Sequence, residues 1–335
     1  MISLPDDVPD REILFGLVPG DLPCVDEPEY DMRANRLLLL AVQNMREELE
    51  AFVARHGAHR VVVVLGASNT GIDEAQRHVD RWLDEGAKPK AMWFSQIELG
   101  TPADYLRRVL GVKGPAYVVS TACSSSAKAF VSARRLIAAG VADAAIVGGV
   151  DGRCRFAMNG FHALGALSQG LCRPLAPDRD GINLGEGVAL FTMEKAAANN
   201  AVYFAGAGET SDAYHATAPD PEGRGAEAAM RAALADAALA PSDIGYINLH
   251  GTGTQANDAM EMKAVTRIFK DLGGVRVEST KPMTGHCLGA AGAIEAAICW
   301  LYISSGLVKG AALSNSFAFG GSNACVALVP EGGDA

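Results

Sequence analysis

The chain has 335 residues, of which 49% are hydrophobic and 20% charged, a composition typical of a compact globular protein and far from that of a disordered one. Its formal net charge of −10 argues against a general nucleic-acid-binding protein, because such a protein needs a basic surface to neutralise phosphates. We therefore expect no nucleic-acid partner, and an acidic protein partner would need a local basic patch.

The seven cysteines are scattered, with neither Cys-x-x-Cys pairs nor a Cys/His spacing typical of zinc sites. Neither a metal centre nor a disulfide framework is predicted, and without a recognisable secretory signal the natural compartment is the reducing cytoplasm. The most apolar run, 290–307, carries Glu295 together with glycines and serines. It is interpreted as a buried helix, so no membrane association is expected.

In the first half of the chain, residues 1–30 are rich in Pro, Asp and Glu and are predicted to form an irregular surface segment. Apolar residues at roughly helical spacing predict a helix over 35–55, and the continuous apolar run at 60–66 predicts a strand covered on both faces. Residues 144–151 and 187–194 predict two further strands, separated by a loop-rich segment.

The second half repeats this plan. Strands are predicted at 203–208, 246–249 and 275–281, helices at 225–238 and 258–269, and a final strand at 324–329. The strand at 275–281 leads into a small-residue corner and helix, as does the strand near 118, which indicates a weak internal duplication. Small residues on such helices favour a layered α/β/α/β/α arrangement.

Cys123 follows the strand near 118 and stands at or beside the start of a helix that runs to Gly140. Unpaired N–H groups and the helix dipole favour the thiolate there, and the thiolate is the nucleophile. The alternative is a buried cysteine that serves as a small apolar core residue. His250 and His286 occupy equivalent strand-to-helix corners, where ligands gather in open α/β sheets. The histidines at 56, 59 and 78 lie in charged surroundings and are predicted to be surface residues.

Four motifs together resemble the elongating β-ketoacyl-acyl carrier protein synthases of the thiolase superfamily: Thr121-Ala122-Cys123-Ser124-Ser125, His250-Gly251-Thr252-Gly253-Thr254, the run 279–286, and the run 315–324. Gly160-Phe161, Arg179-Asp180-Gly181 and 211–215 match as well, so the likeness extends from about Val61 to Val329. The resemblance implies a thiolase-like fold, a duplicated five-layer α/β/α/β/α domain. Its N-terminal half, 1–198, would carry the nucleophilic cysteine, and its C-terminal half, 199–335, both catalytic histidines.

The resemblance implies that Cys123 takes an acyl group, as a thioester, from the phosphopantetheine arm of an acyl carrier protein. Malonyl-acyl carrier protein would then lose CO2, and its enolate would attack the acyl group to give a β-ketoacyl-acyl carrier protein in fatty acid, polyketide or polyene synthesis. His250 and His286 would stabilise the enolate by hydrogen bonding. The backbone N–H groups of Cys123 and Phe319 would bind the oxyanion of the condensation step.

Other matched residues have supporting roles by the same resemblance. Lys281 and Glu295 would tune the charge beside His286, or would simply form a buried structural ion pair. Gly320-Gly321 would shape the oxyanion site, or would be a plain tight turn. The remaining residues would contact substrate: Thr252 and Thr254 along the path of the pantetheine arm, and Phe161, Phe317 and Ile182 at the acyl pocket. Ile182 replaces a usual Phe and would widen that pocket.

Asp258 and Glu261 are interpreted as helix-start residues and not as catalytic acids. The expected partners are acyl carrier protein and a second subunit, in a homodimer or in a heterodimer with a ketosynthase-like chain. No cofactor is expected, because the phosphopantetheine arm comes with the carrier protein. Since carrier proteins are acidic, a local basic patch is predicted as their docking site, with Arg33, Arg36, Lys88 and Lys90 as its candidates.

The sequence departs from the family in two places. The usual opening strand has no clear counterpart, and the connection at 309–313 is several tens of residues shorter than expected. A missing central strand would leave a sheet edge that needs cover.

Three alternatives stay open. A degradative thiolase needs a second catalytic cysteine, and Cys325 has the wrong surroundings. An initiating condensing enzyme would place Asn where His286 stands. A non-catalytic chain-length-factor subunit would lack the nucleophile that Cys123 supplies.

Overall fold

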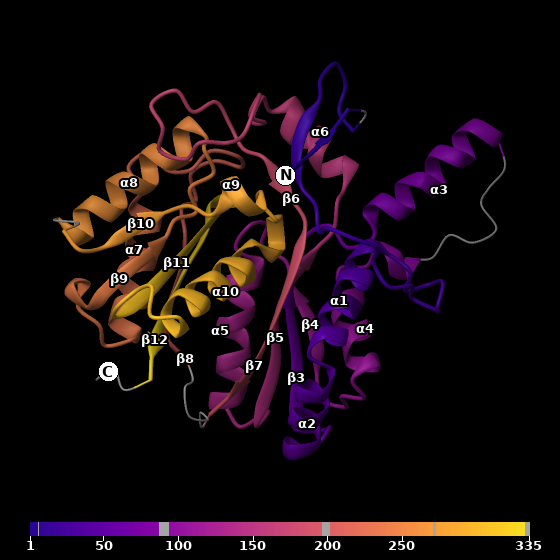
Figure 1. The fold of residues 1–335 in the computed structure, drawn as a ribbon, viewed down its shortest axis with the longest axis horizontal. Helices are drawn as coiled ribbons and strands as arrows, with labels where there is room; N and C mark the ends of the chain where they lie inside the picture. Colours follow the sequence, from indigo (N-terminus) through magenta and orange to yellow (C-terminus); the bar gives the residue numbers. More distant parts are fainter. Residues whose placement is uncertain (6, 87–93, 196–201, 271–272, 332–335) are drawn as a thin grey trace.

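Two β-sheets and three sets of helices form five layers, as Figure 1 shows. The computed structural model describes residues 1–335 except 6, 87–93, 196–201, 271–272 and 332–335. Separate apolar cores fill the spaces outside the first sheet, between the sheets and outside the second sheet. The predicted α/β/α/β/α fold is therefore confirmed.

The first sheet has the strand order β4-β3-β5-β7, with β7 antiparallel to β5 and the other pairs parallel. Its apolar run at 61–66 is completely buried, because helices cover both faces of the sheet. The strands are β3 (Val61–Gly66), β4 (Ala116–Val119), β5 (Ala144–Asp151) and β7 (Gly187–Glu194). The outer helices are α1 (Arg33–Asn44), α2 (Arg46–His56) and α4 (Thr101–Val109).

The second sheet has the order β10-β9-β11-β12-β8. Two helices lie between the sheets, α5 (Ser125–Ala138) and α10 (Ala291–Ser304), and two cover the outer face, α7 (Arg224–Asp236) and α8 (Gln255–Phe269). The strands are β8 (Val202–Ser211), β9 (Ile244–Asn248), β10 (Arg276–Glu278), β11 (Ala311–Ala318) and β12 (Ser322–Pro330).

The two sheets share one plan, which supports the internal duplication. In each, three neighbouring strands are parallel and the next one is antiparallel, so β4-β3-β5-β7 corresponds to β10-β9-β11-β12. Strand β8 has no counterpart among the described strands of the first sheet. Because β8 lies at the edge beside β12, the missing strand belongs at the edge beside β7, and the expectation of a missing central strand is wrong.

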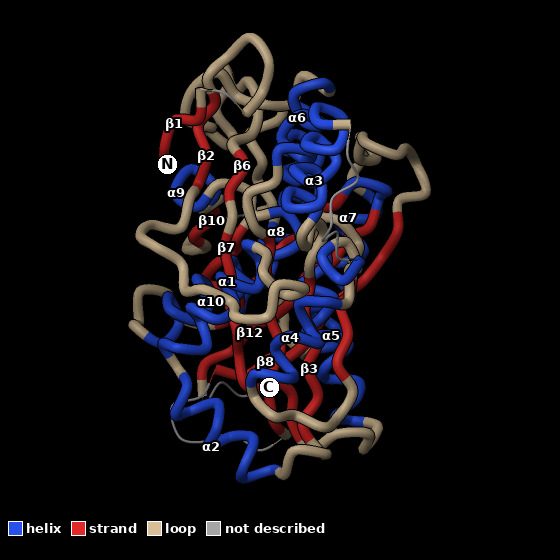
Figure 2. Tube along the Cα trace, turned by 90° about the vertical axis from the view of Figure 1, so that its right-hand side faces the viewer, coloured by secondary structure: helices blue, strands red, loops and turns tan. Residues whose placement is uncertain are grey.

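The prediction of an irregular segment over residues 1–30 is also wrong in part. Strands β1 (Ile2–Leu4) and β2 (Ile13–Gly16) form a hairpin that continues into β6 (Leu184–Gly185). Ile13 and Phe15 are buried there against Met158 and Ile182, so the short apolar island is a core element. The hairpin lies at the same end of the molecule as α6 (Arg155–Ala163) and α9 (Lys281–Thr284), as Figure 2 shows.

Three further observations complete the comparison with the predicted elements. The helix predicted over 35–55 is two helices that meet at Met45. Helix α3 (Ile72–Glu85) projects away from the body (Figure 1). Of the helices in the described ranges, none is long and apolar enough to cross a lipid bilayer. The division predicted between residues 198 and 199 falls outside the described residues and stays a prediction.

Candidate functional site

Cys123 lies in the turn between β4 and α5, just before the helix begins at Ser125. Ala122 has a φ of 53°, a left-handed conformation that is uncommon for a residue with a side chain. Hydroxyl groups hold this turn: Thr121 N donates to Ser125 Oγ at 2.9 Å, and Ser124 Oγ donates to the Thr121 carbonyl at 2.8 Å. The turn therefore fixes the sulfur by backbone geometry.

The cysteine and two of the histidines predicted from the sequence meet at one point. The Cys123 sulfur and one ring nitrogen of each of His250 and His286 lie within 4.8 Å of one another. His286 Nε2 is 2.8 Å from the sulfur, and the two imidazoles stand edge to face with centroids 5.3 Å apart. The Phe319 backbone N–H favours the ionised sulfur and so lowers the pKa of the Cys123 thiol. These three side chains come from turns and loops in both halves of the fold.

A cavity of about 220 Å³ opens onto the sulfur. Phe161 and Phe319 stack at its wall with ring centroids 5.4 Å apart. Lys281 and Glu295 are not in its lining. The predicted residues that do line it are Cys123, Phe161, Ile182, His250, Thr252, Thr254, His286, Phe317 and Phe319.

His250 follows the end of β9 and is held through its backbone. His250 N and Gly251 N each donate to the Glu261 carboxylate at 2.8 Å, and Asn315 Nδ2 donates to it at 3.1 Å. Glu261 is completely buried in α8, so its interpretation as a helix-start residue is corrected: it anchors the His250 loop. Asp258 does lie in the first turn of α8.

His286 lies between α9 and the short 3-10 helix η3 (Leu288–Ala290), and not at the start of α10 as predicted. Its N–H donates to the Asn183 carbonyl at 2.8 Å, and its own carbonyl accepts from Gly185 N at 3.0 Å. Gly285 has a φ of 71°, and a Cβ there would lie 2.4 Å from the Leu184 carbonyl oxygen. Only glycine fits this approach, which explains the Gly-His pair in the sequence.

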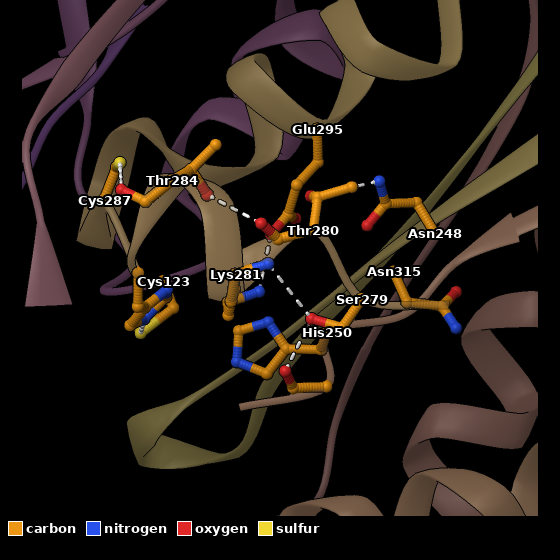
Figure 3. Close-up of polar contacts among 12 residues, drawn as sticks. Cys123, Asn248, His250, Ser279, Thr280, Lys281, Thr284, Cys287, Glu295 and Asn315 are labelled. Carbon is orange, nitrogen blue, oxygen red and sulfur yellow. Dashed lines mark hydrogen bonds and ion pairs between the residues drawn. The ribbon is translucent and has the colours of Figure 1, made fainter. Parts of the chain in front are cut away.

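Lys281 and Glu295 form an ion pair, with Nζ and Oε1 2.5 Å apart (Figure 3). Both side chains are almost completely buried. Burial, and then the positive charge of Lys281, lower the pKa of both His250 and His286 well below the usual value for histidine. The two rings are therefore neutral at neutral pH.

The Cys123 thiol does not behave as its helix position predicts. Burial raises its pKa to about 12, although Lys281 and the Phe319 N–H oppose that rise. The expectation of a resting thiolate is therefore wrong, because desolvation outweighs the helix start. The neutral thiol instead faces His286 Nε2, a ring nitrogen able to take its proton. The same Cys/His/His set also has the chemistry to hold a soft metal ion.

The two docking candidates that the structure describes, Arg33 and Arg36, do not line the cavity. Arg33 is paired with the buried carboxylate of Glu186, and Arg36 is paired with Asp31 at 2.6 Å. Lys88 and Lys90 lie outside the described residues. Among the histidines predicted to be on the surface, His59 is exposed and His78 is partly exposed. His56 is partly buried and bonds Glu194 at 2.8 Å, which corrects its interpretation.

Two family models match consecutive parts of the chain: "Beta-ketoacyl synthase, N-terminal domain" matches residues 29–199, and "Beta-ketoacyl synthase, C-terminal domain" matches residues 201–312. Nodulation protein E of Rhizobium leguminosarum bv. trifolii is 34% identical, over 96% of this chain and 89% of its own length. The 3-oxoacyl-[acyl-carrier-protein] synthase 2 of Staphylococcus aureus (strain COL) is also 34% identical, over 82% of this chain and 70% of its own length.

Solved structures give the same picture. One chain of the complex between the ketosynthase ApeO and its chain length factor ApeC, from Xenorhabdus doucetiae, superposes with a TM-score of 0.92 at 39% identity. The match covers 98% of this chain and 90% of that one. A chain of the ishigamide ketosynthase/chain length factor superposes with a TM-score of 0.85 at 27% identity, over 96% of this chain and 89% of that one.

Proposed function

The chain belongs to the β-ketoacyl synthase family and is an acyltransferase, and from that premise we propose that Cys123, His250 and His286 carry out a decarboxylative Claisen condensation on carrier-bound thioesters. The observation that carries this proposal is the convergence of one sulfur and two neutral imidazoles on a single cavity. The steps below follow from the atoms that meet there.

Acyl transfer begins at the Cys123 sulfur. His286 Nε2, at 2.8 Å, accepts the thiol proton as the sulfur attacks the carbonyl carbon of the incoming acyl thioester. The N–H groups of Cys123 and Phe319 bind the tetrahedral oxyanion, and the bond to the carrier thiol then breaks. The departing thiolate takes up the proton, so the step yields acyl-Cys123 and a free carrier thiol.

Decarboxylation uses the histidine pair. When malonyl thioester binds, loss of CO2 leaves an electron pair on the α-carbon, and negative charge develops on the thioester oxygen. N–H groups of neutral His250 and His286 stabilise that charge, since a neutral imidazole presents a donor or an acceptor according to which nitrogen holds the proton. The carbanion attacks the carbonyl carbon of acyl-Cys123, the carbon–sulfur bond breaks, and the departing Cys123 thiolate takes a proton from solvent to restore the thiol.

Different residues of the cavity wall contact the two ends of the substrate, the pantetheine arm and the acyl group. Thr252 and Thr254, whose hydroxyls are 2.9 Å apart, offer hydrogen bonds along the path of the pantetheine arm. Phe161, Phe317 and Ile182 supply the apolar border of the acyl group. The phosphopantetheine arm arrives on the carrier protein, so the enzyme needs no cofactor of its own for this chemistry.

Acyl carrier protein is the proposed substrate carrier, in line with the names of the relatives. Arg36 is the more informative of the docking candidates, because Arg33 already neutralises buried Glu186 and its loss would unbalance the interior. We expect Arg36→Glu to raise the apparent KM for carrier-linked substrate at low salt. An unchanged KM would remove Arg36 from the docking site.

A second ketosynthase-like subunit is the other proposed partner. Large apolar side chains are exposed on projecting helix α3 and on neighbouring segments: Trp82, Leu83, Phe94, Ile97 and Phe156. Exposed large apolar side chains on neighbouring elements are typical of a protein interface. We propose that this face contacts the second subunit, and that Leu83→Asp weakens the dimer in light-scattering measurements.

A second candidate function, that of a chain-length-factor-like partner, is favoured by the similarity to ketosynthase/chain-length-factor complexes. Condensation assays separate the two. The chain is incubated alone with acyl- and malonyl-acyl carrier protein, and the carrier products are analysed by mass spectrometry. A β-ketoacyl product abolished by Cys123→Ala supports catalysis by this chain. Product that forms only with an added ketosynthase, and that persists with Cys123→Ala, supports the partner function.

A further inference from the structure

Asp151 is a completely buried carboxylate at the end of β5 that the sequence analysis did not single out. Its oxygens accept the N–H groups of Ser68 at 3.0 Å, Asn69 at 2.8 Å and Gly289 at 2.7 Å, and the Ser68 hydroxyl at 2.7 Å. No cation among the described residues forms an ion pair with it. Such a carboxylate is stabilised by hydrogen bonds alone.

The donors come from opposite halves of the fold. Ser68 and Asn69 follow β3 in the first half, whereas Gly289 lies in η3, next to the segment that carries His286. The approach is so close that a Cβ on Gly289 would lie 2.7 Å from Asp151 Oδ2. The Asp151 carboxylate therefore links the loop after β3 in the first half to η3 in the second half, next to the segment that carries His286.

The segment joined to Asp151 is buried, and it contains a residue in an unfavourable backbone conformation. Leu288, between His286 and Gly289, has a φ of 48°, a conformation that costs about 1 to 3 kcal/mol and persists only where the surroundings impose it. On its other side, His286 is held by the backbone of Asn183 and Gly185. Release of Gly289 would let Leu288 relax and would shift the imidazole away from the Cys123 sulfur.

We propose that Asp151 is a positioning residue for His286: by binding Gly289 N–H and the loop after β3, it holds the imidazole within reach of Cys123. The activity part of its test rests on the proposed function, whereas the labelling part does not. A displacement near 1 Å at reacting groups costs on the order of a hundredfold in rate.

The charge of Asp151 gives a second readout. Burial raises its pKa to about 6, so it is ionised at neutral pH. Its negative charge in turn raises the pKa of three neighbouring thiols, those of Cys123, Cys154 and Cys287. Removing the charge should lower the pKa of Cys123 and speed its alkylation at a fixed pH.

The test uses full-length Asp151→Asn, with Asp73→Asn as the matched control. Asp73 is also a buried carboxylate of the first half that accepts a backbone N–H, from Arg155 at 3.0 Å, but it contacts neither catalytic corner. For Asp151→Asn we expect kcat for malonyl decarboxylation to fall at least tenfold with little change in KM. Iodoacetamide should alkylate Cys123 roughly two- to threefold faster at pH 8, as expected for a lower thiol pKa. The control should match the wild type in both assays.

Unchanged kcat and unchanged alkylation in a folded Asp151→Asn protein would overturn the proposal. So would losses of acyl loading and decarboxylation that are fully matched by a fall in the folded fraction, which indicate a merely structural role. If that variant does not fold, Ser68→Ala removes only the hydroxyl contact, and a kcat loss of at least twofold is expected from it. If the wild type has no decarboxylase activity, the proposed function fails and the alkylation rates alone decide the role of Asp151.

Discussion

The corner that carries Cys123 and the corners that carry the two histidines are built on different principles. The cysteine turn is held by short-range hydroxyl and backbone contacts and a left-handed Ala122, and it precedes a regular helix. The histidine corners instead depend on buried charges: Glu261 accepts the His250 N–H, and Lys281, paired with Glu295, lowers the pKa of both rings. One half of the fold positions Cys123, the proposed nucleophile, and the other sets the protonation of the two imidazoles beside it.

This difference teaches that the nucleophile is not activated on its own. A helix start alone leaves the buried thiol with a pKa raised to about 12. The chemistry depends on neutral imidazoles whose pKa is lowered by burial and by Lys281. Acyl transfer and decarboxylation should therefore be separable by substitution, and the experiments below use that separation.

Cys123→Ala gives the largest expected effect. It removes the nucleophile, so acyl transfer should fall by at least about a thousandfold, while decarboxylation of malonyl thioester continues because the histidine corners are intact. Intact-protein mass spectrometry follows the first activity and CO2 release the second. Equal loss of both activities in a folded variant would contradict the division between the corners.

His250→Asn tests the histidine corner and should affect decarboxylation but not acyl loading. Loss of one donor to the developing enolate should lower decarboxylation by about 10² to 10³, while acyl loading of Cys123 should stay near the wild-type rate. Exposed His59→Asn serves as the control. A variant that loads acyl groups slowly and decarboxylates normally would reverse the assigned roles.

Because the Lys281–Glu295 ion pair is buried, removing one partner should lower the free energy of unfolding. Lys281→Met leaves the Glu295 carboxylate unpaired in the interior and should cost about 3 to 5 kcal/mol in the free energy of unfolding. The double variant Lys281→Met/Glu295→Leu should recover much of that loss in urea titrations. Additive losses in the double variant would show that the two side chains do not act as a pair.

The smallest expected effect is a shift in pH dependence. Because both histidines have lowered pKa values, the rings should stay neutral as the pH falls through the usual value for histidine, and decarboxylation should persist there. Lys281→Met removes a charge that disfavours the imidazolium, so the acidic limb of the pH–rate profile should move to higher pH. A wild-type limb centred above pH 7 would contradict neutral, desolvated rings.

Much of the fold follows from local patterns in the sequence. The apolar run at 61–66 and the repeated strand-to-helix corners predict the duplicated sheets, because strand periodicity and small-residue helices are local signals. The N-terminal hairpin was hidden in a polar segment, since the partners of Ile13 and Phe15 come from residues 158–184. Long-range pairing of this kind leaves no mark on the local pattern.

The sequence predicts the site residues that lie in recognisable motifs. It does not predict the contacts and pKa shifts that arise only when distant segments pack together. Cys123, His250 and His286 stand in recognisable corners, and the structure brings them together. Glu261 binds backbone N–H groups of the loop that precedes its helix, and Asp151 binds N–H groups distant in sequence; no spacing rule reveals either contact. The raised pKa of the thiol likewise depends on desolvation, which needs the packed structure.

The central claim is that this one sulfur carries the acyl group. Its most direct measurement is intact-protein and peptide mass spectrometry of the wild-type chain after incubation with an acyl-acyl carrier protein. The account predicts a single acyl mass increase that maps to Cys123 and is absent from Cys123→Ala. An unmodified wild-type protein, or an acyl group found on another residue, would contradict it.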